Sequence, residues 1–193
     1  MNISAQNEEK LRSAFRPINS LMLGMWRLGL GQFINIWPEG IGRIMVIGHT
    51  GRKTGLRHQS PVNYTLVDGE IYCVAGYGKR ADWYRNLLAN PIVDVWLPDG
   101  WWAGVAEEMK DSPERLPLIR EVLIASAFAG RMAGFDPAMS DAALDKMTAN
   151  YRLMRIHRME ARTGRNGPGD LAWVWPLATM LLLPFIFFRR RRK

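Results

Sequence analysis

Short hydrophobic runs separated by turn residues fill the middle of the chain. Residues 44–47 are four consecutive apolar residues close to glycines, which is typical of a buried strand. Residues 59–67 alternate in polarity and lead through an Asp-Gly pair into residues 70–75, which predicts a tight hairpin. A Pro-Asp-Gly turn predicts a second hairpin. We predict strands over residues 43–48, 59–67, 70–75, 92–97, 101–107 and 151–159.

Polar capping residues precede three stretches with helical character. Asp82, Ser112 and Ser140 are suited to accept a hydrogen bond from the amides of a first helical turn. In the N-terminal part, apolar residues at helical spacing are broken by glycines. They predict a helix that packs on the core or also touches a bilayer. We predict helices over residues 82–89, 112–129 and 140–149, and an amphipathic segment within residues 4–37.

Strands joined mainly by hairpins, with helices inserted between them, predict an α+β protein built on an antiparallel barrel. The chain has no βαβ alternation and no Gly-x-Gly-x-x-Gly turn, which argues against a Rossmann domain. We predict four segments: an amphipathic N-terminal helical segment (1–40), the barrel (41–160), a linker rich in Gly, Pro and Arg (161–170), and an apolar tail (171–193).

The tail combines an apolar stretch with a basic end. Residues 171–188 carry no charge, and residues 189–193 are all basic, so they contribute five of the net charge of +8. This placement favours anionic lipid headgroups as partners and does not indicate a nucleic-acid-binding surface. A helix over the apolar stretch would be about 27 Å long, which is barely a membrane span, and Pro176 and Pro184 would disturb it.

The orientation of the tail adds a second constraint. The positive-inside rule favours a basic end in the cytoplasm, where we also expect the barrel. Both conditions are met by a re-entrant hairpin bent at the prolines, or by a segment that lies in the interface. We therefore predict the cytoplasmic face of the cell membrane. The alternatives are a buried core segment and an apolar tail that binds a partner protein.

Cysteine and histidine usage limits the possible chemistry. Cys73 is the single cysteine, so no disulfide within the chain is possible, and a reducing compartment is the simplest interpretation. Its place in a predicted strand favours a buried core thiol. The histidines, His49, His58 and His157, have no second His or Cys at ligand spacing, so we predict no metal site. The polar start of the chain argues against a secretory signal.

Two glycine-containing stretches carry the candidate chemistry. In the first, Gly51 and Gly55 permit a tight turn, and Arg52, Lys53 and Arg57 supply positive charge for a phosphate. By itself such a basic turn is more often a solvated hairpin. In the second stretch, Gly76 and Gly78 would let a flat ligand approach the backbone, and the amides of the helix that starts at Asp82 could face an anion. Trp83 would wall a ring pocket or anchor the core.

These two stretches, in this order, resemble the deazaflavin-dependent nitroreductase family. The motifs that carry the resemblance are Gly51-Arg52-Lys53-Thr54-Gly55 and Trp83-Tyr84-Arg85-Asn86-Leu87-Leu88-Ala89-Asn90-Pro91. The similarity covers residues 44–107, with a weaker part over residues 151–156. It implies a split β-barrel, often a homodimer, that binds the deazaflavin coenzyme F-420.

The resemblance also implies roles for individual residues. Arg52, Lys53, Thr54 and Arg57 would belong to the turn that holds the phosphate and acidic tail of the coenzyme. The backbone of the second stretch and the start of the following helix would flank its ring, with Trp83, Asn86 and Asn90 at that wall. The residues of this backbone are Ala75, Gly76, Tyr77, Gly78 and Lys79.

The implied reaction is hydride transfer from the reduced coenzyme to a quinone, an activated alkene or a nitroaromatic, which requires no catalytic side-chain acid. The family often has Ser where this chain has Gly76, so a hydroxyl near the ring is missing. Tyr151 is the candidate tyrosine for the acceptor pocket, and Phe128 and Phe135 offer apolar walls. One rival is an FMN-binding barrel with a redox or storage role. Another is a non-catalytic protein that binds a ligand at a membrane surface.

Overall fold

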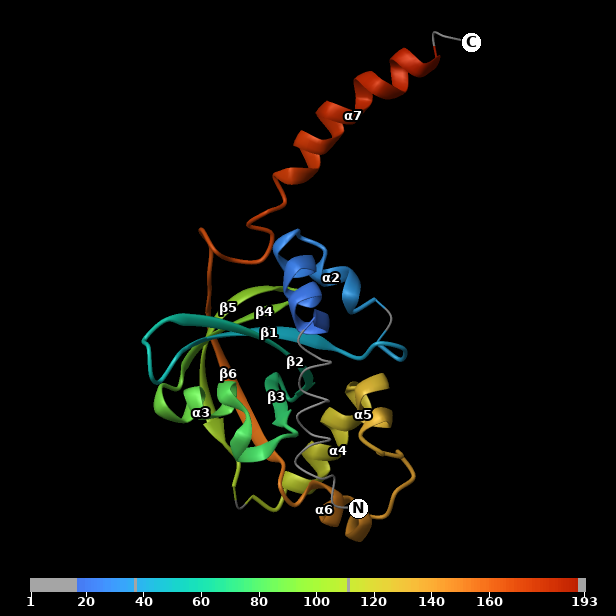
Figure 1. Ribbon diagram of the computed structural model, residues 1–193. Helices are drawn as coiled ribbons and strands as arrows, with labels where there is room; N and C mark the ends of the chain where they lie inside the picture. Colours follow the sequence, from blue (N-terminus) through green and yellow to red (C-terminus); the bar gives the residue numbers. More distant parts are fainter. Residues whose placement is uncertain (1–16, 37, 111, 191–193) are drawn as a thin grey trace.

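Six antiparallel strands form a closed barrel in the computed structural model, which describes residues 17–36, 38–110 and 112–190 (Figure 1). Around the barrel the strands follow the order β1-β2-β3-β6-β5-β4, and β4 pairs with β1 to close it. The strands are β1 (Ile44–Thr50), β2 (Arg57–Val67), β3 (Glu70–Ala75), β4 (Ile92–Leu97), β5 (Gly100–Glu108) and β6 (Arg152–Ala161).

The two predicted hairpins are confirmed. Val67 pairs with Glu70 across a turn in which Asp68 and Gly69 both have positive φ, as a two-residue hairpin turn requires. Leu97 pairs with Gly100 in the second hairpin. The last strand, β6, lies between β3 and β5 and so joins the two halves of the barrel. The chain thus has the predicted α+β architecture of a split β-barrel.

The barrel interior is apolar. Met45, Ile47, Ile71 and Ile156 are fully buried side chains contributed by three different strands. Cys73 belongs to the same core, as predicted, and burial raises the pKa of its thiol to about 12. Such close packing fixes the strand ends, from which the candidate site residues extend.

The helices partly depart from the sequence predictions. The helix α3 (Asp82–Ala89) has the predicted bounds, but its N-cap is Ala81, and Asp82 forms ion pairs with arginines instead. The helix α6 (Asp141–Thr148) is capped as predicted, because Ser140 Oγ accepts a hydrogen bond from the Ala143 amide.

The long helix predicted over residues 112–129 is wrong. The chain instead forms α4 (Arg115–Ala125) and α5 (Phe128–Met132), separated at Ala127, which has a φ of 42°. A positive φ cannot continue a right-handed helix, so the chain turns there. The shared face of α4 and α6 packs on β3 and β6 and covers one side of the barrel (Figure 1).

The N-terminal segment is helical over residues 17–27, and α2 (Gly31–Ile34) follows after a turn. Trp26 anchors this helix on the barrel, since its buried ring lies 6.4 Å from the ring of Trp96 between centroids. The part of the predicted amphipathic segment that precedes residue 17 lies outside the described residues.

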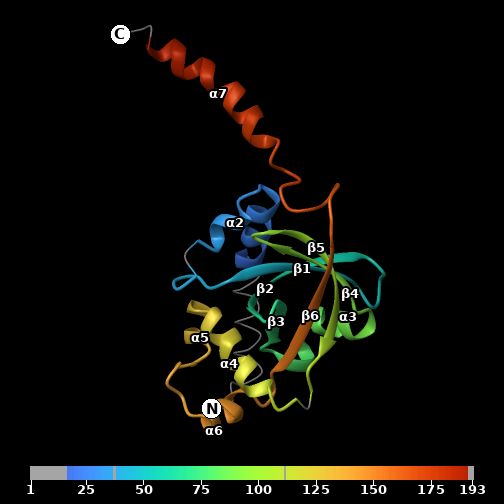
Figure 2. The same ribbon diagram turned by 180° about the vertical axis from the view of Figure 1, so that it is seen from behind.

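Residues 162–173 carry no regular helix or strand, which fits the predicted linker, although residue 161 still belongs to β6. The helix α7 (Val174–Arg190) follows and projects away from the barrel (Figures 1 and 2). Within the described part of the chain, no helix combines the length and the apolar character needed to cross a membrane.

Candidate functional site

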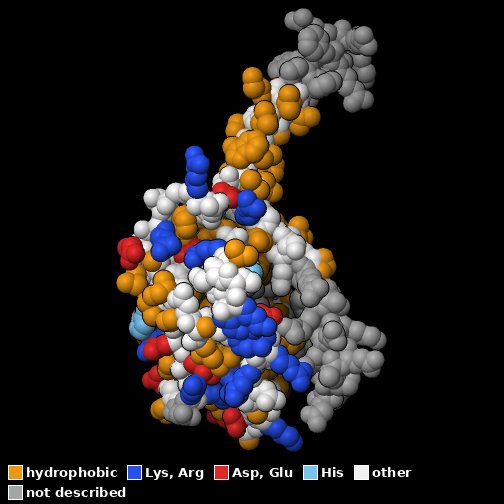
Figure 3. Space-filling view, turned by 60° about the vertical axis from the view of Figure 1, so that its left-hand side comes forward, with side chains coloured by type: hydrophobic (Ala, Val, Ile, Leu, Met, Phe, Trp, Pro, Cys, Tyr) orange, Lys and Arg blue, Asp and Glu red, His pale blue; other side chains and the backbone are white. Residues whose placement is uncertain are grey.

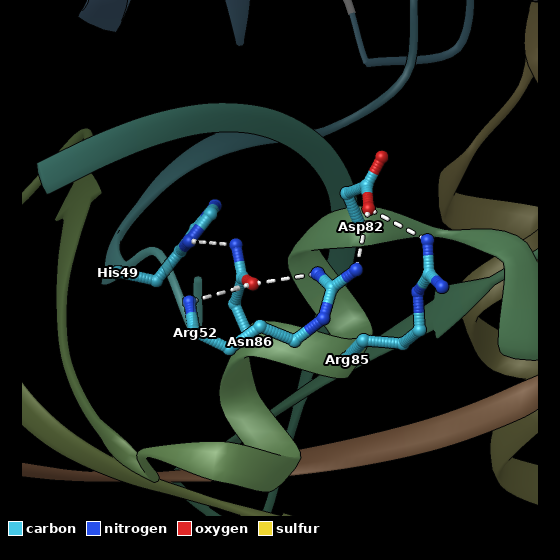
Figure 4. Close-up of polar contacts among 5 residues, drawn as sticks. All are labelled: His49, Arg52, Asp82, Arg85 and Asn86. Atoms are coloured by element: carbon cyan, nitrogen blue, oxygen red, sulfur yellow. Dashed lines mark hydrogen bonds and ion pairs between the residues drawn. The ribbon is translucent and has the colours of Figure 1, made fainter. Parts of the chain in front are cut away.

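The first candidate stretch forms the turn between β1 and β2. His49 and Thr50 belong to β1 and Arg57 begins β2, so the turn itself spans residues 51–56. The turn packs against α3, because Asn86 Oδ1 accepts hydrogen bonds from the Arg52 backbone amide at 3.2 Å and from Arg52 Nη1 at 2.9 Å. The sequence motifs 51–55 and 83–91 therefore lie side by side (Figure 4).

His49 supports this contact from the barrel wall. Its side chain is buried, with Nε2 3.0 Å from Ser60 Oγ and Nδ1 3.2 Å from Asn86 Nδ2. Burial, together with the charges of His58 and Arg57, lowers the pKa of His49 to about 4. At neutral pH the ring is therefore uncharged, and it can accept a hydrogen bond from Asn86 while it bonds to Ser60.

Arg52 also reaches the start of α3. Its Nη2 lies 3.2 Å from Asp82 Oδ1, and Arg85 Nη2 donates to the same oxygen at 2.7 Å (Figure 4). Burial acts to raise the pKa of the Asp82 carboxyl, but the hydrogen bonds and charges of Arg52 and Arg85 outweigh it and lower that pKa. The Asp82 carboxylate thus holds the guanidinium groups of Arg52 and Arg85 beside the turn.

The predicted coenzyme residue Arg57 has a structural partner. Its guanidinium forms an ion pair with Asp94, whose side chain is only 3% exposed and whose Oδ2 accepts a hydrogen bond from Trp101 Nε1 at 2.6 Å. Gly48 makes this approach possible, because a side chain there would collide with Asp94 and Arg57. The Arg57 side chain is 47% exposed, so part of it remains accessible to a ligand.

Lys53 and Thr54 lie at the tip of the turn, and both are exposed. Thr54 Oγ accepts a hydrogen bond from the Leu56 amide at 3.3 Å, which tightens the turn, and Gly55 adopts a φ of 68°. The Lys53 ammonium is therefore available to an anionic ligand without rearrangement of the turn.

The second stretch, residues 75–79, runs from the end of β3 into the short 3-10 helix η1 (Gly78–Arg80), which leads directly to α3. Gly76 is exposed, and an added Cβ would meet only Tyr151, at 3.8 Å from its Cζ. Gly78 has a φ of 53° and lies against the Asn150 carbonyl, where a Cβ would collide. The backbone at Gly76 is thus open to a ligand, whereas Gly78 is required by the fold.

Tyr151 stands beside this backbone. It is half-buried, and burial together with nearby Tyr77 raises the pKa of its hydroxyl group. The other two residues proposed as acceptor walls are Phe135 and Phe128. Phe135 is a buried core residue, and Phe128 lies near Ile41, before the start of β1 and at the opposite end of that strand from the turn. Phe135 belongs to the apolar cluster against which Tyr151 packs, and an acceptor wall formed by these phenylalanines stays a prediction.

Trp83 and Asn90 mainly support α3. Trp83 is half-buried and packs against the barrel core, which matches the core-anchor alternative. Asn90 Oδ1 accepts a hydrogen bond from the Ile92 amide at 3.1 Å, and the Asn90 amide bonds to the Asn86 carbonyl. Both residues hold the helix that carries Asn86 and Arg85.

A basic hollow on the other side of α3 was missed by the sequence analysis. It has a volume of about 530 Å³. At its base Glu108, only 6% exposed, lies 3.5 Å from Lys110 Nζ and 4.0 Å from Arg152 Nε. Burial and the bond to Glu108 raise the pKa of Tyr84 to about 12. The hollow is lined by Lys79, Tyr84, Arg85, Leu88, Glu108, Lys110 and Arg152.

Lys and Arg side chains gather on the face of the molecule that carries α3 (Figure 3). Exposed cations of this region come from the turn (Lys53), from η1 (Lys79) and from α3 (Arg85). A face of this kind suits an anionic ligand with several negative groups. Among the described residues, no group of His, Cys, Asp or Glu is arranged to hold a metal ion.

Comparison with protein families identifies the chain. The model of the family described as F420H(2)-dependent quinone reductase matches residues 31–136, more than half of the chain. The chain belongs to this family. It is therefore an F-420-dependent oxidoreductase, and coenzyme F-420 is its cofactor. The matched residues include β1 to β5, the basic turn and α3, so the predicted family type is confirmed.

Solved structures show more distant likeness. An F420-H2 dependent reductase shares 22% identity over 60% of this chain and 94% of its own, with a TM-score of 0.41. A conserved hypothetical protein from Mycobacterium tuberculosis shares 23% over 66% and 78%, with a TM-score of 0.43. A FAD-binding protein from Mesorhizobium loti shares 20% over 64% and 86%, with a TM-score of 0.40. The curated proteins gave no match.

Proposed function

We propose that this F-420-dependent oxidoreductase transfers hydride to a hydrophobic, quinone-like acceptor at the surface of a membrane. The observation that carries the proposal is the combination of an enzyme of the quinone reductase family with an exposed apolar helix, α7, on one molecule. A quinone with a long apolar chain is dissolved in the bilayer, so an enzyme held at the bilayer meets it at a high local concentration.

The described residues fit the coenzyme. F-420 carries a phosphate and an acidic tail, and the face around α3 offers exposed cations from the turn and from η1. Its flat ring needs an open approach to the backbone, which Gly76 provides beside Tyr151. On these grounds Arg52, Lys53, Thr54 and Arg57 would hold the anionic groups of the coenzyme. The deazaflavin ring would lie along the backbone from Ala75 to Lys79, which leads to the start of α3.

The bound coenzyme supplies the hydride, and the residues of the chain position it. Asn86 fixes Arg52, and Asp82 orders Arg52 and Arg85, so the cationic groups are arranged before the ligand arrives. Such preorganisation lowers the cost of binding. Tyr151 stands at the edge of the Gly76 backbone. Its ring would pack there against the acceptor and exclude water.

The membrane part of the proposal rests on α7. Its Met180, Leu181 and Leu182 are 74%, 60% and 59% exposed, which is unusual for apolar side chains in a soluble protein. The uncharged stretch 171–188 is followed by the basic residues 189–193, and anionic lipid headgroups attract such a cluster. We place the enzyme at the cytoplasmic face of the cell membrane.

The test compares two acceptors. The rate of oxidation of reduced F-420 is measured with a menaquinone embedded in anionic vesicles and with a short-chain quinone in solution. We expect a variant with Met180, Leu181 and Leu182 all replaced by Gln to lose about tenfold or more with the vesicle acceptor and to keep its rate with the soluble one. Equal rates of the variant and the parent with both acceptors would contradict the membrane role.

A second variant shows whether the loss is specific to α7. Leu88→Gln changes a 51% exposed apolar side chain on α3, far from α7 in Figure 1. We expect this variant to bind vesicles as the parent does. If the parent protein catalyses oxidation of the reduced coenzyme by neither quinone, the proposed quinone acceptor is wrong. This conclusion holds whether or not the protein binds vesicles.

A further inference from the structure

The residues that lead into α7 and begin it (169–175, the root of α7) are bound to the end of the helix over residues 17–27. Arg27 Nε lies 3.0 and 3.2 Å from the two carboxylate oxygens of Asp170, and Arg27 Nη2 lies 2.8 Å from Oδ2, a two-pronged ion pair between residues 143 positions apart. The Asp170 side chain is only 14% exposed. Bidentate pairs of this kind fix the relative direction of the two groups.

Backbone contacts reinforce this ion pair. The Gly169 amide donates to the Trp26 carbonyl at 2.9 Å, and the Leu171 amide donates to the Arg27 carbonyl at 2.8 Å. The indole of Trp175, in the first turn of α7, donates to the Leu28 carbonyl at 2.9 Å. We call these contacts, together with the Arg27–Asp170 pair, the root clamp.

The clamp is itself fastened to the barrel. Trp26 is 3% exposed and packs on Trp96 of β4. The backbone of Gly31 lies against the Trp26 ring, where a side chain would collide with the ring. On the C-terminal side, the Arg162 amide donates to the Trp101 carbonyl of β5 at 2.7 Å, and Gly167 lies against the Trp101 ring. The segment predicted as a linker therefore holds α7 at a fixed direction to the barrel.

Exposed apolar side chains lie on both partners of the clamp. In the N-terminal segment, Leu21, Phe33 and Ile36 are 62%, 52% and 69% exposed. Trp173 and Trp175 at the root are 60% and 47% exposed, and indoles favour the interface between lipid and water. In both ribbon views residues 17–36 and α7 occupy the same end of the barrel, away from α3 and α6 (Figures 1 and 2).

We propose that residues 17–36 and α7 form one lipid-binding surface for anionic bilayers, and that the root clamp holds the barrel over the bilayer in a single orientation. This inference rests on the proposed function, since it assumes that α7 meets lipid. Anionic lipid is the partner that fits, because this surface carries exposed apolar side chains and the apolar stretch of α7 is followed in the sequence by the basic residues 189–193. A flexible tether would let the barrel change its orientation freely. A clamped helix keeps the face that carries α3 at a constant distance from the bilayer.

The experiment uses the full chain with single introduced cysteines. The native Cys73 is fully buried, so a thiol-reactive environment-sensitive dye labels only the new site. The three labelled variants are Met180→Cys on α7, Phe33→Cys in the N-terminal segment, and Leu88→Cys on α3 as the control. With vesicles of phosphatidylcholine and phosphatidylglycerol, we expect a blue shift with several-fold brighter emission at positions 180 and 33, and no change at position 88.

Release of the clamp then tests its role. In the Asp170→Asn background we expect the dye at position 180 to respond as before and the dye at position 33 to lose at least half of its response. The charge swap Arg27→Asp with Asp170→Arg should restore the response at position 33. A dye at position 33 that stays in water with the clamp intact, or that is unaffected by Asp170→Asn, would overturn the proposal.

The outcomes separate this inference from the proposed function. If position 180 responds and position 33 does not, α7 is a simple tether, and the membrane role of the enzyme stands without a second contact. If no position responds, α7 does not bind lipid, and both the inference and the membrane part of the proposed function fail. The rate of oxidation of reduced F-420 by the short-chain quinone is measured without vesicles. It therefore tests the proposed quinone acceptor independently of lipid binding.

Discussion

The side-chain amide of Asn86 links the buried ring of His49 to the guanidinium of Arg52. Its nitrogen lies 3.2 Å from His49 Nδ1, and its oxygen lies 2.9 Å from Arg52 Nη1. The amide is itself buried, at 5% exposure, so its bonds form away from water. Replacement by an apolar group would leave His49 Nδ1 without this partner and would remove the bond to Arg52 Nη1. One residue on α3 thus fixes both the barrel wall and the basic turn.

Asn86→Leu should therefore weaken both stability and coenzyme binding. Loss of a buried hydrogen-bond partner costs about 1 to 3 kcal/mol, which lowers the melting temperature by several degrees. We expect the Kd for F-420, measured by coenzyme fluorescence, to rise about tenfold, because Arg52 loses its bonds to Asn86 and retains its ion pair with Asp82. Asn86→Asp is the matched control. It keeps an acceptor for Arg52, so its binding should fall less than that of Asn86→Leu.

His49 should make stability depend on pH. Its folded pKa, about 4, is below the ordinary value of 6.5, so the unfolded chain binds the proton first as the pH falls. Its contribution is fully present above about pH 6.5 and is lost progressively toward pH 4, with a magnitude of at most about 3 kcal/mol. Denaturant unfolding at several pH values measures this, with His49→Gln as the control. A variant as pH-dependent as the parent would refute the role of His49.

The strands were predictable because hairpin signals are local. The pattern of residues 70–75 and 92–97 gave the bounds of β3 and β4 without error, since Asp-Gly, Asn-Pro and Pro-Asp-Gly mark their ends. The order of strands in the barrel was not predictable. The pairing of β6 with both β3 and β5 depends on contacts over long sequence distances.

Other structural features could not be predicted from the sequence, for physical reasons. No residue type signals that Ala127 takes a positive φ, so the break between α4 and α5 is invisible in the sequence. Asp82 is a good capping residue by type, but two arginines from different segments compete for its carboxylate. Glu108 and Arg152 come together only because β5 pairs with β6. The composition of residues 161–170 predicts a linker and cannot reveal that Asp170 meets Arg27.

The two glycines of the second stretch should respond differently to alanine. Gly76→Ala adds a Cβ that meets only Tyr151 at an ordinary contact distance, so we expect a change in stability below about 1 kcal/mol. Gly78→Ala forces a side chain against the Asn150 carbonyl at a positive φ, and we expect a loss of about 2 kcal/mol or more. Thermal unfolding of the two variants side by side measures the difference. Equal melting temperatures would contradict this description of the turn.

Two cations of the first candidate stretch, Lys53 and Arg57, should differ in their effect on stability. Lys53→Ala removes an exposed ammonium, so we expect a higher Kd for F-420, by about five- to tenfold, a weaker salt dependence of binding, and an unchanged melting temperature.

Arg57→Ala should lower the melting temperature as well, because it leaves the buried Asp94 carboxylate without its ion pair. Titrations with F-420 at two salt concentrations, combined with thermal unfolding, compare the two variants. A Lys53→Ala protein that binds F-420 like the parent would remove Lys53 from the site.

The central claim is that the chain oxidises reduced F-420 with a quinone. The most direct test follows the return of oxidised-coenzyme absorbance when a menaquinone analogue is added to the full-length protein with reduced F-420, with FMN as the alternative cofactor. We predict saturable, protein-dependent oxidation of the deazaflavin that Lys53→Ala slows at low coenzyme concentration. Tight binding of FMN alone, or F-420 binding without any oxidation by the quinone, would contradict the account.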